Sequence, residues 1–475
     1  MSGAPFTFTV SITPLDGTAN PARSFEVTGH DPERGSPQTR EYRLPDSGHK
    51  SYLDFFSHLA RDFGTRVPLN RRSPAEPVFD AKYKVLLTEN LAPGMLYGYG
   101  DPAVLCLKGG AYGQDGTWYY VVVTSNDAPD SFPIIRSCDL TRWEFAGFVF
   151  PEGEKPEWTA VGRYVSDFWA PEMLMVDGEF RVYFTARDKD THQLSIGVAK
   201  SKSPTGPFIA SKKPLLAGNT IDPHAFIDER GAYLYWKKDN NDIWPSCLTH
   251  LLYKQRYLIA ELFTAKEDQA TASFIQTLWP WIEGLQPIER FFVQQVLIEA
   301  VTSTFAEFRH KLAQLLSSPS TSAINDEIHD VLEAMRTPVY AQKLSDDGLS
   351  LVDERVKVME NDQTWEAHLI EGMWLTARSG KYYLFYSGND FSTSEYGIGV
   401  AIADSLFGVF KKMPSPLLRS TKEWSGPGHP SVAVGPDGEP LLFFHAYVPG
   451  RTGYKEFRAL LTARIQFEGD RVLLK

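Results

Sequence analysis

The sequence predicts a mainly β fold, a five-bladed β-propeller with a helical insertion in blade three and an extra N-terminal segment. Three observations support this prediction. A hairpin-like unit occurs five times, about 50–60 residues apart except between the third and fourth copies. Each copy continues into a third apolar segment, and the first four copies reach a fourth. Three or four strands at such a period are typical of propeller blades.

The repeated unit is clearest in its third copy, Ile221 to Lys238, which reads IDPHAFIDERGAYLYWKK. An apolar run is followed by a turn that ends at Gly231, and then by an alternating aromatic run. This order indicates two antiparallel strands joined by a tight connection. The other copies open at Asp101, Ala170, Ile370 and His429.

The pattern changes between the third and fourth copies. From Cys247 to about Met335, apolar residues recur at spacings of three and four, which predicts helices. Trp279, Trp281 and Phe292 in this region have three open interpretations: a substrate lid, a dimer surface, or the core of the insertion itself.

The change of pattern divides the chain into four parts. These are an N-terminal segment of mixed structure (1–80), blades one to three (81–243), the helical insertion (244–337), and the rest of blade three with blades four and five (338–475).

The N-terminal segment carries no recognisable chemistry. Ser51 to Phe63 is predicted to form a short helix, with Ser51 as the N-cap and apolar residues on one face. The segment is expected to wrap the propeller or to cover one of its ends.

Charge and cysteine content restrict the partners and the compartment. A net charge of −11 argues against nucleic acid and anionic membranes, which require basic patches, and fits a neutral substrate or simple solubility. Three cysteines without metal-type spacing argue against a disulfide framework.

Residues 1–15 lack the features of a secretory signal, and no apolar run is long enough to span a membrane. We expect a cytoplasmic protein, or a secreted one whose leader is absent from this sequence. The oligomeric state stays open.

The residues that open the five copies are the candidates for chemistry. In a propeller the first strand of each blade lines the central channel, so these residues are expected to meet at one mouth. Each has an ordinary structural interpretation: Asp before Pro is a common turn opener, and a single histidine usually belongs to the core. Their shared repeat position favours a functional site instead. In order they are Asp101, the group Trp169-Ala170-Pro171-Glu172, Asp222, Glu371 and His429.

Three carboxylates at one mouth suit the hydrolysis of a glycosidic bond. Hydrolysis needs one carboxylic acid to protonate the leaving oxygen and one carboxylate to activate water or attack the sugar. The acid needs a raised pKa to keep its proton near neutrality, and a third carboxylate close by can supply that shift. The reaction thus has a use for all three.

From about Leu87 to the C-terminus, without the helical insertion, the chain resembles the glycoside hydrolases of family 43, five-bladed propeller enzymes that act on arabinose- and xylose-containing polysaccharides. Singly its motifs are weak, but in this order, one per blade, they are specific. They are Tyr99-Gly100-Asp101-Pro102, Phe168-Trp169-Ala170-Pro171-Glu172, Ile221-Asp222-Pro223-His224-Ala225-Phe226, Ile370-Glu371-Gly372, Tyr386-Ser387-Gly388 and Gly426-Pro427-Gly428-His429.

The resemblance implies a role for each site residue. Asp101 would be the general base, Glu371 the general acid, and Asp222 the residue that tunes the pKa of Glu371 and orients it. The family inverts configuration, so the carboxyl groups of Asp101 and Glu371 are expected roughly 6.5–9.5 Å apart. The expected substrate-binding residues are Trp169, His429, Trp374 and Phe168. Met373 departs from the family, which usually has proline there, and this leaves the adjoining wall of the sugar subsite uncertain.

The resemblance leaves the type of action and the metal content open. We expect an exo-acting enzyme that releases terminal L-arabinofuranose or D-xylose. The alternatives are an endo-1,5-arabinanase and a carbohydrate-binding propeller without catalysis. No cofactor is expected to be required. A structural calcium stays open, with His429 as the candidate anchor of a calcium ion or water in the channel, although a lone histidine is weak support for a metal site.

Overall fold

The computed structural model describes residues 7–13, 24–30, 37–43, 45, 49–71, 81–109 and 116–475. It divides into two compact units, each built from two separate parts of the chain. One unit combines Met1–Ala75 with Asn240–Arg336, and the other combines Glu76–Asp239 with Thr337–Lys475. The N-terminal segment and the helical region, which lie far apart in the sequence, therefore share one unit.

The second unit consists of five antiparallel sheets that follow one another along the chain. The strands of blade one are β5(Ala103–Leu107), β6(Trp118–Val122), β7(Ser131–Ser137) and β8(Glu144–Phe150). Those of blade two are β9(Trp169–Val176), β10(Glu179–Arg187), β11(Leu194–Ser201) and β12(Ile209–Ala210). Those of blade three are β13(Thr220–Asp228), β14(Gly231–Lys238), β15(Val339–Leu344) and β16(Leu351–Met359). Those of blade four are β17(Ile370–Arg378), β18(Lys381–Gly388), β19(Gly397–Ala403) and β20(Lys411–Lys412), with the short helix η4(Thr364–Glu366) before them. Those of blade five are β21(Ser425–Val434), β22(Pro440–Tyr447), β23(Arg458–Glu468) and β24(Arg471–Leu474).

The five sheets close into a ring. Their first strands contact one another in the order β5, β9, β13, β17, β21 and back to β5. This confirms the predicted five-bladed propeller, in which the first strand of every blade faces the central channel.

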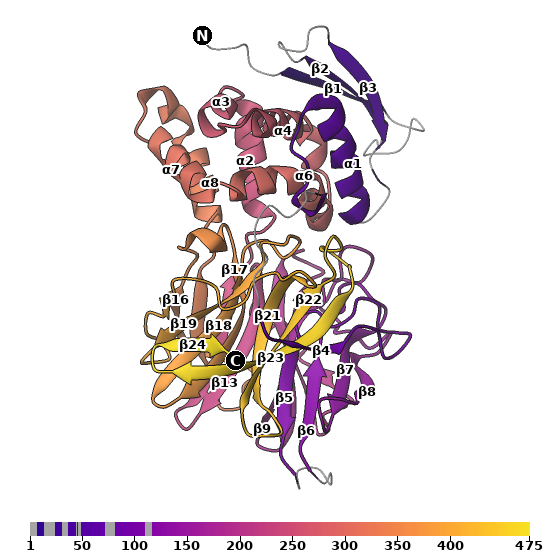
Figure 1. Ribbon diagram of the computed structural model, residues 1–475, viewed down its shortest axis with the longest axis vertical. Coiled ribbons are helices and arrows are strands. Elements are labelled where there is room, and N and C mark those ends of the chain that lie inside the picture. Colours follow the sequence, from indigo (N-terminus) through magenta and orange to yellow (C-terminus); the bar gives the residue numbers. More distant parts are fainter. Residues whose placement is uncertain are drawn as a thin grey trace. The chain divides into compact units, whose positions relative to one another are not determined.

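A strand that the repeat pattern did not include joins the two ends of the propeller chain. β4(Lys84–Leu87) precedes blade one but pairs antiparallel with β23 of blade five, with Leu87 opposite Leu460 (Figure 1). Blade five thus receives strands from both ends of the propeller sequence. The hydrogen bonds of this sheet fasten the last blade to the segment that leads into the first.

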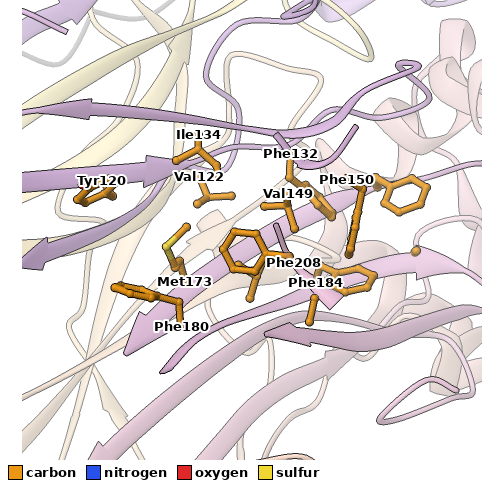
Figure 2. Close-up of a cluster of buried hydrophobic side chains, with 14 of the residues drawn as sticks. Tyr120, Val122, Phe132, Ile134, Val149, Phe150, Met173, Phe180, Phe184 and Phe208 are labelled. Atoms are coloured by element: carbon orange, nitrogen blue, oxygen red, sulfur yellow. The ribbon is translucent and has the colours of Figure 1, made fainter. Parts of the chain in front are cut away.

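The blades pack against each other through aromatic and branched side chains. Between blades one and two, β6, β7 and β8 face β9 and β10 across a buried cluster that includes Phe132, Phe150 and Phe184 (Figure 2). The ring centroid of Phe184 lies 5.5 Å from that of Phe132 and 5.2 Å from that of Phe150. Such fully buried aromatic side chains contribute much of the packing energy between sheets.

The other unit contains the chain between β14 and β15, which is helical. Its helices are α2(Ile243–Lys254), α3(Leu258–Leu262), α4(Lys266–Thr277), α5(Trp279–Ile282), α6(Pro287–Thr302), α7(Phe305–Leu315), η3(Pro319–Ile324) and α8(Asn325–Ala334). The N-terminal part of the same unit contributes β1(Thr7–Thr13), β2(Ser24–His30), β3(Gln38–Arg43), α1(His49–Phe63) and η1(Leu69–Arg71). α1 and α6 lie side by side within this unit (Figure 1).

Buried polar contacts join the two parts of the helical unit. The Arg66 guanidinium forms an ion pair of 2.8 Å with Asp268 on α4. The amide N–H of Leu69 donates to the Glu299 carboxylate on α6, also at 2.8 Å. Because buried charges are tolerated when they are paired, these contacts indicate that the segment is an integral part of the unit.

The structure can be compared with several predictions about this part of the chain. The helix expected from Ser51 begins at His49, so Ser51 lies inside α1 and is not its N-cap. Trp281 and Phe292 are buried, and Trp279 is partly buried with its ring stacked on His250. Residues 1–6, 14 and 15 of the stretch inspected for a leader lie outside the described residues. Within the described part of the chain, no helix is both long and apolar enough to cross a membrane.

Replacing Phe184 by alanine is expected to destabilise the propeller. The side chain is fully buried between blades one and two, and Phe→Ala changes in cores cost about 3–5 kcal/mol. Denaturant unfolding followed by tryptophan fluorescence measures the loss. Phe407→Ala is the matched control, because Phe407 is 39% exposed and its removal is expected to cost much less. Equal losses in both variants would contradict the assignment of Phe184 to the core.

Candidate active site

The first strands of blades two, three and four each contain a β-bulge near their start. At each bulge two residues of the first strand lie opposite a single residue of the second strand, and the register then resumes. The extra residues are Ala170–Pro171, Asp222–Pro223 and Gly372–Met373. Bulges of this kind re-aim side chains and are common next to active sites.

The first residue of each of these three bulges has a left-handed backbone conformation. Blades one and five each have a residue with the same conformation at the corresponding position. The φ angles are 53° for Asp101, 46° for Ala170, 55° for Asp222, 60° for Gly372 and 51° for His429. These five positions are equivalent around the ring. The predicted equivalence of Glu371 to the aspartates is therefore wrong by one residue: Gly372 occupies that position, and Glu371 corresponds to Ile221 and Trp169. Met373 replaces the proline that follows this position in the other four blades, so the repeat pattern alone did not show the offset.

A ring of hydrogen bonds connects these five positions. The amide N–H of each one donates to a side chain of the preceding blade. The bonds run from Ala170 to Thr124 Oγ1 (2.8 Å), Asp222 to Thr185 Oγ1 (3.2 Å), Gly372 to Asp222 Oδ2 (2.8 Å), His429 to Ser387 Oγ (2.7 Å) and Asp101 to His445 Nδ1 (3.1 Å). A buried N–H group without a partner is costly, so each bond fixes one bulge to its neighbouring blade.

Asp101 is buried among cationic and hydroxyl groups. The Arg458 guanidinium donates to Oδ1 at 2.8 Å, and the Thr124 hydroxyl donates to Oδ2 at 2.5 Å. His429 Nδ1 lies 3.4 Å from Oδ1. Gly100 makes room for Arg458, because a Cβ atom at that position would come 1.9 Å from the guanidinium carbon.

These neighbours determine the protonation of Asp101. Burial alone would raise the pKa of this carboxyl, but the Arg458 guanidinium, the two imidazoles and the Thr124 hydroxyl together outweigh it, and the pKa of Asp101 lies well below its usual range. Burial also lowers the pKa of both His429 and His445, which favours the neutral imidazoles. His445 Nδ1 accepts the Asp101 N–H and therefore carries no proton of its own. Asp101 is thus a stable carboxylate.

Asp222 and Glu371 have the opposite tendency. Burial raises the pKa of both carboxyl groups; the Lys237 ammonium opposes the shift, and each pKa remains above its ordinary value. Repulsion from Asp222 adds to the shift of Glu371, and repulsion from Asp101 adds to that of Asp222. Since Asp222 accepts the N–H of Gly372, it is fixed beside the residue that follows Glu371.

Glu371 is oriented by a tyrosine that needs unusual space. The Tyr396 hydroxyl donates to Glu371 Oε1 at 2.8 Å. A Cβ atom at Gly428 would lie 1.8 Å from the Tyr396 ring, so only glycine allows this close approach. The glycine that precedes His429 is therefore required for the position of Glu371.

A second buried network joins the first strands of three blades. His224 Nδ1 lies 2.7 Å from Glu172 Oε2, and its Nε2 accepts the N–H of Leu375. The other Glu172 oxygen accepts the N–H of Ala225. This network links β9, β13 and β17 directly below the bulges. Glu172, which belonged to the candidate group of blade two, thus has a structural role here.

The predicted residues fall into two groups. The members of the first group interact with one another at one end of the channel; they are Asp101, Asp222, Glu371 and His429. Trp169 is partly exposed at the position equivalent to Glu371, and its indole N–H donates to Asn126. Trp374 is partly buried, with its ring 5.0 Å from that of His224.

Phe168 is a correction to the predicted substrate-binding set. Its side chain has no exposed surface and belongs to the cluster between blades one and two, where it contacts Phe132 and Phe184. The side chains of neighbouring strand residues point in opposite directions, so Trp169 and Phe168 cannot face the same side. Trp169 is partly exposed, whereas Phe168 offers no surface that a ligand could contact.

Five functional neighbours were missed by the sequence analysis. They are Thr124, Lys237, Tyr396, His445 and Arg458, which follow second strands or lie on or near second and third strands. Lys237, His445 and Arg458 are more than 100 residues along the chain from the carboxylates that they contact. The available signal was a charged residue inside or beside an apolar run, as at Lys237 and Arg458. Such residues are almost never buried unless they are paired.

The metal expectation meets one relevant observation. Among the described residues, no group of three or more His, Cys, Asp or Glu side chains has an arrangement that could hold a metal ion. Calcium prefers six to eight oxygen ligands. Asp101 Oδ1, which lies 3.4 Å from His429 Nδ1, already accepts a hydrogen bond from Arg458. The side chains that the structure describes around His429 therefore do not form a calcium cage.

Comparison with known proteins places the chain in a family. The profile of the glycosyl hydrolases family 43 matches residues 111–285 and 325–472. Asp222 and Glu371 lie within the matched residues, and Asp101 precedes them. A solved thermostable family-43 glycoside hydrolase is 26% identical, with a TM-score of 0.53 over 80% of this chain and 94% of that chain.

Curated relatives agree with this placement. A xylosidase/arabinosidase of Bacteroides ovatus is 24% identical over 78% of this chain and 92% of that protein. Xylosidase/arabinosidase 43A of Humicola insolens is 33% identical over 27% of this chain and 37% of that protein. The carboxylate site described above lies in the part of the chain with the propeller fold. The chain therefore belongs to glycosyl hydrolase family 43 and is a glycosidase that hydrolyses O-glycosyl bonds.

Proposed function

We propose that the protein is an exo-acting, inverting glycosidase that releases terminal L-arabinofuranose or D-xylose from plant-type oligo- or polysaccharides. Both curated relatives described above are named xylosidase/arabinosidase, which supports these two pentoses. In this proposal Asp101 is the general base and Glu371 the general acid. Asp222 tunes the pKa of Glu371, and Trp169 and His429 line the sugar subsite.

The observation that carries the proposal is the contrast between the surroundings of the two carboxyl groups. The Arg458 guanidinium, 2.8 Å from Asp101, acts with the neighbouring imidazole and hydroxyl groups to hold the pKa of Asp101 well below its usual range, whereas burial and the charge of Asp222 raise the pKa of Glu371 to about 7. Two carboxyl groups whose environments shift their pKa values in opposite directions are suited to act as base and acid in one reaction. A pair with equal pKa values would not divide the work in this way.

The reaction follows from these protonation states. A water molecule attacks the anomeric carbon while its proton passes to the Asp101 carboxylate. At the same time the proton of Glu371 passes to the glycosidic oxygen, and the bond from that oxygen to the anomeric carbon breaks. The water approaches from the face opposite the leaving group, so the configuration inverts.

Glu371→Gln and Asp101→Asn are each expected to lower kcat by roughly 10²–10⁴-fold, because each variant removes one proton-transfer group. Release of nitrophenol from aryl arabinofuranoside and xyloside measures the effect. Neither substitution changes the fold greatly, and far-UV circular dichroism checks this. Wild-type activity in Glu371→Gln would eliminate Glu371 as the acid, and the absence of any activity in the wild-type protein would favour a carbohydrate-binding propeller.

The pH profile of kcat/KM is expected to be a broad bell. Activity falls on the acidic side as Asp101 gains a proton, and its lowered pKa places this limb below the ordinary range of aspartic acid. Activity falls on the basic side as Glu371 loses its proton, and its raised pKa places this limb above the ordinary range of glutamic acid. Arg458→Met is expected to move only the acidic limb, towards higher pH. A basic limb near the ordinary value of about 4.3 would contradict the assignment of Glu371.

The products are expected to be single pentoses of inverted configuration. Proton NMR during hydrolysis of 1,5-linked arabino-oligosaccharides and of xylo-oligosaccharides detects the first anomer formed before mutarotation. Chain shortening by one residue at a time indicates exo action. Early release of di- and trisaccharides from arabinan would support the endo-1,5-arabinanase alternative, and a retained configuration would contradict the water-attack mechanism.

A further inference from the structure

Blade three breaks the hydrogen-bond pattern of the ring at one position. Blades two, four and five each use one second-strand residue to accept the N–H of the left-handed residue of the next blade. These acceptors are Thr185, Ser387 and His445, which pair with Trp169, Glu371 and Gly428 of their own blades. In blade three the paired residue opposite Ile221 is Lys237. A lysine ammonium cannot accept a hydrogen bond, so Asp222 accepts the N–H of Gly372 instead.

Lys237 is placed against the catalytic acid rather than in the ring of hydrogen bonds. Its side chain has no exposed surface, and Nζ lies 3.4 Å from Glu371 Oε2 and 3.8 Å from Asp239 Oδ1. Within the described residues, Nζ makes no hydrogen bond of good geometry. A buried ammonium without hydrogen bonds is costly, and proteins tolerate such groups mainly where they serve a function.

We propose that Lys237 is a positioning residue that stabilises the Glu371 carboxylate as it forms during catalysis. This inference rests on the proposed role of Glu371 as the general acid. While Glu371 holds its proton, Lys237 faces a neutral carboxyl group. When the proton passes to the glycosidic oxygen and the glycosidic bond breaks, Glu371 becomes an anion beside a fixed ammonium.

The stabilisation is therefore larger in the transition state than in the ground state. Only interactions of this kind accelerate the chemical step. A preorganised charge in a site with little water needs no rearrangement at the moment of reaction. Lys237 also explains how Glu371 can keep its proton before reaction and still release it: burial and Asp222 favour the acid form, and the ammonium favours the carboxylate.

The charged groups around Glu371 come from several elements. Asp222 on β13 and the nearby Asp239 carry negative charge, and Lys237 on β14 carries positive charge. The Tyr396 hydroxyl before β19 and the His429 ring on β21 complete the surroundings, and the buried His368 faces Lys237. Among these groups, Lys237 is the cation that directly contacts the Glu371 carboxylate. Its removal is therefore expected to change the acid strength of Glu371.

The test is Lys237→Met, which removes the charge and keeps the length of the side chain. We expect kcat to fall roughly 100-fold on a substrate with a sugar leaving group, which needs full protonation. The loss should be much smaller on a 2,4-dinitrophenyl glycoside, whose leaving group needs little protonation to depart. The basic limb of the pH profile should move to higher pH, because Glu371 without its neighbouring cation holds its proton more tightly. A double variant with Glu371→Gln should be no less active than Glu371→Gln alone.

Lys238→Met is the matched control, since the adjacent Lys238 binds the Gly218 carbonyl instead. It should leave both rates and the pH profile unchanged. Equal losses of Lys237→Met on both substrates, with an unmoved basic limb, would overturn the inference and assign Lys237 a purely structural role, as would no loss at all. Wild-type activity in Glu371→Gln would instead overturn the proposed function on which the inference rests.

Discussion

The constraint on which the propeller depends is the pairing of five backbone N–H groups, one per blade, with side chains of the preceding blades. Each N–H belongs to a residue with a left-handed backbone near or just before the start of a first strand. That geometry exposes an amide that the sheet ladder cannot satisfy. A side chain of the preceding blade accepts it, so one set of bonds satisfies the backbone, orders the blades and places Asp101, Asp222 and His429 around a common centre.

The ring is symmetric in geometry but not in chemistry, and the asymmetry produces the site. Thr124, Thr185 and Ser387 are neutral acceptors, and the equivalent residue of blade five is His445, which lies with Arg458 beside Asp101. In blade three the same position holds Lys237 beside Glu371. Cationic groups therefore flank both Asp101 and Glu371. At Asp101 the groups that lower the pKa outweigh the effect of burial, and at Glu371 they do not. One carboxyl remains ionised and the other retains its proton, although both belong to the same repeated scaffold.

The helical unit is inserted without loss of sheet continuity. The chain leaves the propeller unit after Asp239 and returns at Thr337, and the flanking strands β14 and β15 still pair, with Lys237 opposite Val339. Because the two ends of the excursion are already neighbours in the sheet, a long insertion there has a small effect on ring closure. The excursion forms its core together with the N-terminal segment, as the buried pair of Arg66 and Asp268 shows.

The sequence by itself determined the five blades, the helical region between β14 and β15, and the candidate carboxylates, because strand alternation, turn residues and the X-Pro openings are local patterns. It did not reveal that Glu371 stands one residue before the bulge, since Met373 hides the marker, nor that Phe168 points into the core. Only the tertiary structure decided which residues surround each carboxylate. Arg458 meets Asp101 from the other end of the propeller sequence, and Lys237 meets Glu371 across the helical excursion. Charge environments depend on through-space distance, which ring closure sets and which chain order does not record.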